Sequence, residues 1–224
     1  LLAAVLLLDS CNPAKHVAEG DYILKYKRDY LGYYLNVVTD DEDIKVEEVQ
    51  SIIKQEPNRR ILGLFRFHMW IYPKDTAKIN QKIQECHEKH ERKNEKRIEK
   101  GKDTTEYKPC GIERRMQKGE PIILYDSALT AKSVEHIHVY LIKKGYFHNT
   151  VRDSVVFNEK KKTATVWYIL EPGTPYTIRN IEYEINDDVL KKYIGYYQNE
   201  SLLDSGDVFD IDIIEKERSR MTRY

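Results

Sequence analysis

Residues that could bind a metal gather in one charged segment of the chain. Cys86, His87 and His90 offer a thiol and two imidazoles at helical spacing, and Cys110 is the nearest further candidate. Structural zinc takes four ligands in a tetrahedron, but a charged stretch separates Cys110 from the other three residues. We therefore interpret these residues as solvated side chains of an exposed helix and expect no metal site.

Other catalytic signatures are equally weak. His136 and His138 lie two residues apart on a predicted helix, so they point to different faces. The sequence contains no glycine-rich phosphate loop, no Gly-x-Ser-x-Gly elbow and no His-Glu-x-x-His zinc motif. The charged groups 113–115 and 215–218 are interpreted as surface ion pairs. We expect a protein that is not an enzyme and needs no cofactor.

The balance of charge excludes one class of partner. The 224 residues contain 37 Lys and Arg against 37 Asp and Glu, a formal net charge of +0, and the mean hydropathy is −0.67. Nucleic-acid binding needs clustered cations without matching acids, so we expect no nucleic-acid partner. An exported chain could oxidise Cys86 and Cys110, but their spacing does not show that they meet, and we expect no required disulfide.

The first residues resemble a secretion signal. The apolar run 1–8 is too short to cross about 30 Å of hydrocarbon, but it fits the apolar part of a cleaved signal. Leu8, Ser10 and Cys11 resemble a bacterial lipobox, in which the cysteine becomes the mature N-terminus and carries the lipid. We expect a signal remnant at 1–10 and lipidation of Cys11. A generic cleaved signal with an incidental cysteine is the alternative.

Helix and strand signals follow in a first predicted unit, 11–73. It has a strand near 22–27, then an acidic turn that caps a helix ended by Pro57. The apolar spacing of 61–72 is interpreted as a helix, although its alternation also allows a strand.

The segment 74–118 is dense in charges of both signs. It predicts an exposed helix that runs into a flexible loop near 101–105. Two interpretations stay open: a solvated spacer, or an insertion that docks a partner.

Two further units are predicted, 119–173 and 174–224. The first has a short strand at 121–125, a helix near 133–144 capped by Gly145, and a hairpin with strands near 150–157 and 163–170. The second has a strand at 176–185, a helix near 187–194 and another helix from about residue 210. Its closing strands are missing, so we expect a fragment with a truncated third unit.

The order of these elements resembles that of POTRA domains, the periplasmic βααββ modules of BamA and TamA-type assembly factors. A helix stopped at Gly145-Tyr146-Phe147 is followed by two strands and then by Glu171-Pro172-Gly173. The chain resembles in particular the lipoprotein form found in Bacteroidetes-type bacteria, TamL. The matching positions are Cys11-Asn12-Pro13, Glu19 to Leu24, Gln55 to Gly63, Ile71-Tyr72, Gly119-Glu120-Pro121, Tyr125-Asp126, Ser133, Lys144 to Phe147, Pro172 to Ile178 and Glu217 to Met221.

The resemblance implies an α+β fold of tandem POTRA-like βααββ modules with a charged helical insertion and an N-terminal lipoprotein signal. It implies a lipid-anchored arm on the periplasmic side of the outer membrane, and a membrane β-barrel that would lie beyond Tyr224. The implied partners are unfolded outer-membrane protein clients, TamB-like or Bam-type subunits, and outer-membrane lipid through Cys11.

Such a module can act without catalysis. An exposed sheet edge is a template for an extended chain, and main-chain hydrogen bonds give affinity with little sequence preference. Lys160 to Lys162 or a neighbouring unit could instead block an edge. The sequence therefore predicts client docking by β-augmentation, and a barrel-less periplasmic lipoprotein scaffold or interaction module is the alternative.

Overall fold

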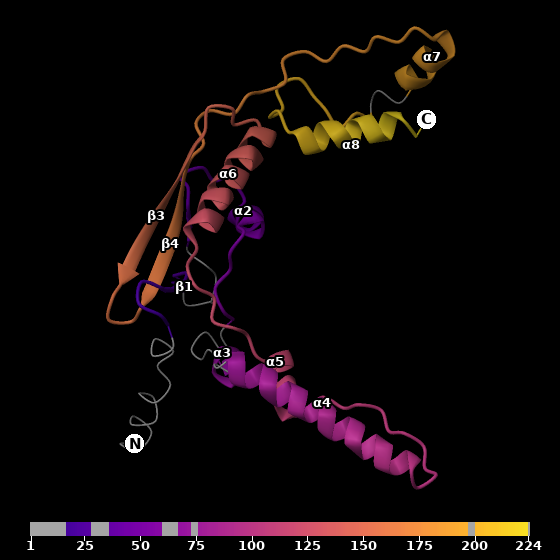
Figure 1. The fold of residues 1–224 in the computed structure, drawn as a ribbon. Coiled ribbons are helices and arrows are strands. Elements are labelled where there is room, and N and C mark those ends of the chain that lie inside the picture. Colours follow the sequence, from indigo (N-terminus) through magenta and orange to yellow (C-terminus); the bar gives the residue numbers. More distant parts are fainter. Residues whose placement is uncertain (1–16, 28–35, 60–66, 73–75, 197–199, 224) are drawn as a thin grey trace, which may run out of the picture. The chain divides into compact units, whose positions relative to one another are not determined.

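The computed structural model of the chain is a mixed α+β structure with a small sheet and seven helices among the described residues (Figure 1). It describes residues 17–27, 36–59, 67–72, 76–196 and 200–223. The predicted signal at 1–10 and the lipidation site Cys11 lie outside these residues. Two compact units are present, one within 1–32, 56–125 and 156–165, the other within 33–55, 126–155 and 166–224.

Strand β4 (Thr163–Glu171) is the centre of the sheet. Strands β1 (Ile23–Lys25) and β2 (Val37–Val38) pair with β4 in parallel, with β1 opposite 163–165 and β2 opposite 168–169. Strand β3 (Thr150–Asn158) pairs with β4 as the other arm of a hairpin. The hairpin confirms the prediction to within one residue at each end.

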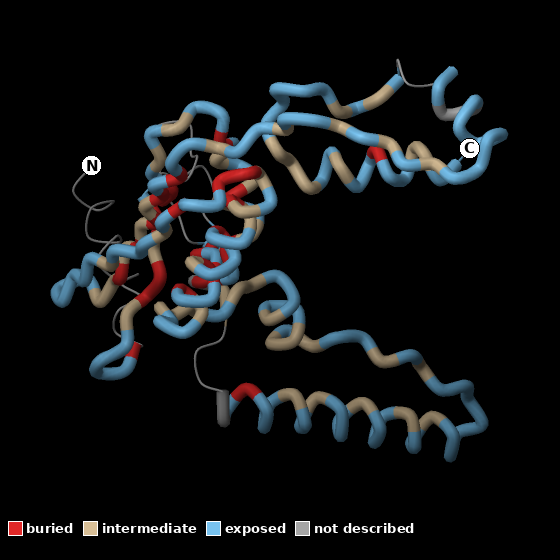
Figure 2. Tube along the Cα trace, turned by 90° about the horizontal axis from the view of Figure 1, so that it is seen from above, coloured by how far each residue is buried: buried red, intermediate tan, exposed pale blue. Residues whose placement is uncertain are grey.

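Helices α2 (Val46–Ile52) and α6 (Ser127–Lys143) pack against each other in the second unit. The Asp126 carboxylate caps α6 by accepting the amides of Ala128 and Leu129 at 2.8 and 3.1 Å, so the helix begins earlier than the predicted residue 133. Buried residues, red in Figure 2, lie along α6 and β4, whereas β3 contains none. The buried side chains of α2, α6 and β4 in this unit include Val49, Ile137, Leu141, Val166, Tyr168 and Leu170.

The strand pairing crosses the boundary between the predicted units 11–73 and 119–173. Strands β1 and β2 come from the first predicted unit and β4 from the second, so the two share one sheet. In sequence order, β1 and β2, α2, α6, β3 and β4 make one strand–helix–helix–strand–strand set, with the charged segment inserted between its two helices. Parallel strands need a long crossover connection, and local periodicity does not reveal which distant strand is the partner.

The charged insertion belongs to the first unit. Helix α4 (Thr76–Ile98) confirms the predicted exposed helix, and α5 (Gly111–Lys118) lies alongside it (Figure 1). Helix α3 (Phe67–Ile71) confirms the described part of the helix predicted over 61–72. Asn94 holds the returning loop, because its side chain donates to the Thr105 carbonyl and accepts the Thr105 amide, both at 2.9 Å. No helix in the described part is long and apolar enough to span a bilayer.

The two ends of the insertion are fastened together by Asn58. Its buried amide donates to the Pro121 carbonyl at 2.7 Å and accepts the Ile123 amide at 3.0 Å. Beside it, the Arg59 side chain pairs with Glu120, and the Arg59 amide donates to the same carboxylate at 3.0 Å. Residues 58–59, before the insertion, therefore lie beside residues 120–123, after it.

The C-terminal segment differs from the prediction at its start. Residues 176–185 form no strand and make a single antiparallel bridge, between Thr177 and Val208. Helices α7 (Asp188–Tyr196) and α8 (Ile211–Met221) confirm the two predicted helices, and Asp210 caps α8 by accepting the Asp212 amide at 2.8 Å. The alternation of apolar residues at 181, 183 and 185 is typical of a strand, but a strand forms only where a neighbouring strand supplies hydrogen-bond partners.

Gly145 ends α6 in the predicted left-handed cap conformation, with φ +90°. Its carbonyl accepts the Tyr176 amide at 2.9 Å, so the segment after the hairpin passes directly over the cap. A Cβ atom at Gly145 would lie 2.6 Å from the Phe209 carbonyl oxygen. Both the backbone conformation and the close approach therefore require glycine.

The two requirements can be separated by a matched pair of variants. Gly206 has φ +101° but nothing within 4 Å of an added Cβ atom. We expect Gly206→Ala to lower the free energy of unfolding by about 1 kcal/mol through strain alone. Gly145→Ala should lower it further, because the Phe209 backbone must also move. Denaturant unfolding measures both, and equal losses would contradict the steric part of the argument.

Candidate docking edge

One edge of the sheet is already occupied by the chain itself. The Leu24 amide donates to the Ile123 carbonyl at 2.9 Å, and the Tyr125 amide donates to the Tyr22 carbonyl at 2.7 Å. These bonds lie on the side of β1 that faces away from β4. The strand predicted at 121–125 is thus a short bridge in the structure, and it closes the outer side of β1.

The opposite edge, formed by β3, is open in the described part of the chain. Strand β3 pairs with β4 and with no other described strand. Its side chains are mostly exposed, and only Val151 and Val155 are half-buried. Val156 is 57% exposed although it is apolar. An unpaired edge of this kind presents backbone N–H and C=O groups to an incoming extended chain.

An aromatic cluster fixes the end of β3. The Phe157 ring lies 4.7 Å from the Tyr22 ring and 5.6 Å from the Tyr125 ring, measured between centroids. Phe157 nevertheless stays 47% exposed. The contacts hold the last residues of the edge in place while leaving an aromatic face accessible.

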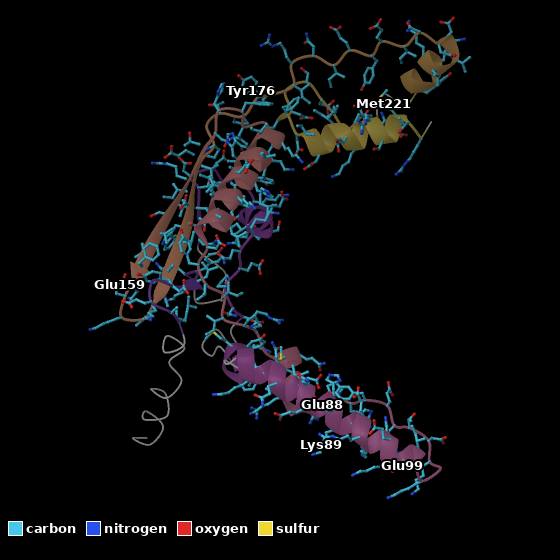
Figure 3. All side chains as sticks on the ribbon, in the orientation of Figure 1. Glu88, Lys89, Glu99, Glu159, Tyr176 and Met221 are labelled. Carbon is cyan, nitrogen blue, oxygen red and sulfur yellow. The ribbon has the colours of Figure 1, made fainter. Side chains whose placement is uncertain are left out.

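Charge at the tip of the hairpin does not run along the edge. The Lys162 ammonium donates to the Val17 carbonyl at 2.7 Å and so is engaged by the N-terminal segment. Glu159, labelled in Figure 3, accepts a hydrogen bond from the Tyr22 hydroxyl at 2.7 Å, which raises the pKa of Tyr22. Lys160 and Lys161 are exposed in the hairpin turn, so a block of the edge by these two lysines stays a prediction.

The candidate metal ligands have other partners. The His87 ring stacks on the Tyr107 ring at 4.3 Å, and its Nε2 lies 3.4 Å from a Glu113 carboxylate oxygen. The His90 ring nitrogen lies 3.1 Å from the Asn94 amide nitrogen. Within the described ranges, no group of three or more His, Cys, Asp or Glu side chains is placed to hold a metal ion.

The remaining predicted polar groups are structural. His138 bonds to Asn149 at 2.6 Å, whereas His136 is exposed on α6. Glu113 caps α5 by accepting the Cys110 amide at 2.7 Å, so it is more than a surface ion-pair residue. Glu217 corrects the same prediction, because it is only 3% exposed and accepts the Leu202 amide at 3.1 Å.

An ion-pair cluster that the sequence analysis did not single out joins the end of α6 to α8. The Lys144 Nζ lies 2.9 Å from Asp210 Oδ2 and 2.8 Å from Asp212 Oδ2. Burial opposes the charge on Lys144, but the bonds to both aspartates outweigh it and raise the pKa of Lys144. The Lys144 ammonium in turn lowers the pKa of Asp212. Partners this far apart in sequence leave no local signal.

Comparison with known proteins does not assign the chain to a family. No family model matches the chain, and a search of curated proteins gives no match. Among solved structures, the chain is similar to the crystal structure of Haemophilus influenzae BamA POTRA3-5, with 13% sequence identity and a TM-score of 0.28. That match covers 92% of this chain and 88% of the other. A TM-score this low carries no argument about fold or function.

Acid should weaken the C-terminal segment. Hydrogen bonds from Lys144 and Arg220 lower the pKa values of Asp212 and Glu217 in the folded chain. The unfolded chain therefore takes up protons first as the pH falls, so the stabilisation is complete above the ordinary carboxyl pKa of about 4 and is lost below it. Denaturant unfolding between about pH 6 and pH 3 should show this loss.

Lys144→Gln is the variant that tests the origin of the pH effect. Without the ammonium group, the pKa of Asp212 returns toward its ordinary value, and the fall in stability with pH should become shallower. The same slope in both proteins would show that Lys144 does not hold Asp212 in its ionised form.

Proposed function

We propose that this chain is a non-enzymatic docking arm that binds extended segments of other polypeptides by adding them as a strand to the open edge of β3. The observation that carries the proposal is the difference between the outer side of β1 and the outer side of β3. The outer side of β1 is bonded to residues 123–125, whereas β3 has no described partner beyond β4. Among the described residues, β3 therefore offers an incoming strand a row of backbone groups that no other strand takes.

The chemistry of this edge suits many clients. Backbone hydrogen bonds form with any extended segment, and the side chains that alternate on the two faces supply the selectivity. Along β3, the exposed apolar side chains of Val156 and Phe157 lie close to the hairpin tip, and Arg152 is paired with Glu171 farther along. Val156 and Phe157 are consecutive, so their side chains point to opposite faces and offer an incoming segment an apolar contact on each face.

The wider setting rests on the sequence resemblance to POTRA domains. One strand–helix–helix–hairpin set in a single sheet is the element order of such a module. We accordingly propose a periplasmic arm of an outer-membrane β-barrel assembly or translocation factor, with unfolded outer-membrane proteins as clients and TamB-like or Bam-type subunits as partners. A barrel-less periplasmic lipoprotein scaffold would use the same edge and is the second candidate.

Amide exchange on the chain tests the docking edge directly. The probe is a synthetic peptide of about ten residues with alternating apolar and polar side chains, the length and pattern of a barrel strand. Binding should protect alternate amides of β3, those that point away from β4, and leave the amides of β1 unchanged. Protection confined to any other element would refute the edge as the site.

A matched pair of lysine substitutions tests the same edge by affinity. Val156→Lys places a charge on the open strand, and we expect it to weaken peptide binding several-fold, because lysine on an edge opposes strand addition. Val139 on α6 is 46% exposed and lies off the edge, so Val139→Lys is the control. Fluorescence anisotropy of the labelled peptide measures both. Equal affinities for the two variants would argue against docking at β3.

Lipid anchoring through Cys11 is a separate part of the proposal. In cells fed labelled palmitate, the wild-type protein should become labelled and fractionate with membranes, and Cys11→Ala should lose the label. Cys86→Ala removes a different cysteine and should keep it. Labelling that survives in Cys11→Ala would show that Cys11 is not the lipidation site.

A further inference from the structure

Two cysteines far apart in sequence meet between α4 and α5. Cys86 lies near the middle of α4, and Cys110 is the residue that caps α5. Both line the same surface hollow, together with Ile79 and Ile112, and both are half-buried free thiols. The neighbouring Cys110 side chain, together with burial, raises the pKa of Cys86 to about 11.

The surrounding contacts hold the two residues together. Tyr107, three positions before Cys110, stacks on His87, the residue that follows Cys86. Glu113 in the first turn of α5 accepts the Cys110 amide at 2.7 Å, bonds to the Tyr107 hydroxyl and lies 3.4 Å from His87. The start of α5 is therefore fastened to the turn of α4 that carries Cys86.

We propose that Cys86 and Cys110 are a cystine site, which an oxidising compartment converts into an intramolecular disulfide that fastens the start of α5 to the middle of α4. The folded chain brings the thiols together before oxidation, so the bond adds to the fold. This agrees with the sequence-based expectation that no disulfide is required for folding.

The oxidant is a small disulfide that reacts by thiol–disulfide exchange, such as oxidised glutathione. One cysteine loses its proton, and the thiolate attacks a sulfur of the oxidant, which forms a mixed disulfide and releases one glutathione thiolate. The second cysteine thiolate attacks the protein sulfur of that mixed disulfide and releases the second glutathione. Two electrons pass from the protein to the oxidant, and the two protons appear on two molecules of reduced glutathione.

Only a folded chain should favour this bond. The Cys11→Ser background leaves Cys86 and Cys110 as the two cysteines, since the sequence contains three. The full chain is equilibrated in a fixed mixture of reduced and oxidised glutathione, once under native conditions and once unfolded in guanidinium chloride. After alkylation and tryptic digestion without reductant, mass spectrometry quantifies the peptide pair linked through 86 and 110.

We expect the linked pair to predominate in the native sample and to fall about tenfold or more on unfolding, because separated thiols lose the local concentration that the fold provides. Cys86→Ser and Cys110→Ser should each abolish it. Mixed disulfides with glutathione, links between two copies, or equal yields in the native and unfolded samples would overturn the proposal. Peptide docking at β3 does not enter this experiment, so its failure leaves the proposed function untouched.

Discussion

The pairing of β4 with three strands is the constraint on which the described fold depends. β1 and β2 bond to β4 in parallel, and β3 joins it through the hairpin. Alternate residues of β4 are buried, with Val166, Tyr168 and Leu170 at most 2% exposed. A shift of one residue in register would turn these side chains to the other face. β4 pairs with one side of β3, and no described strand pairs with the other side.

Local signals predict the elements well, because each is set by residues next to one another. Asp126 and Asp210 cap helices where short-range bonding demands it, and Gly145 ends α6 with a positive φ. Local signals do not predict which strands pair. Ile23 pairs opposite Thr163, far along the chain, and neither segment carries a sequence signal for the other. The predicted division into tandem units stays a prediction, because contacts that span a long sequence separation decide the topology.

The sequence predicts that the site is an exposed sheet edge, but it does not predict which edge. An exposed edge follows from any small sheet, yet only the bonds from Leu24 and Tyr125 show that the β1 side is closed. The same limit applies to the cysteines, whose spacing says nothing about a contact that the return of the loop after α4 creates. Glu217 is the opposite case: its charged neighbours suggest a surface position, but burial is decided by α8 packing against the segment around Leu202.

The bonds of Asn58 separate the charged insertion from the part of the chain that forms the sheet. Because Asn58 and Arg59 bond the chain again at residues 120–123, the described helices α3 to α5 lie in a segment whose two ends are joined. The helices α3 to α5 take no part in the pairing of the described strands. The register that β4 imposes on its partner strands therefore does not act on helices α3 to α5.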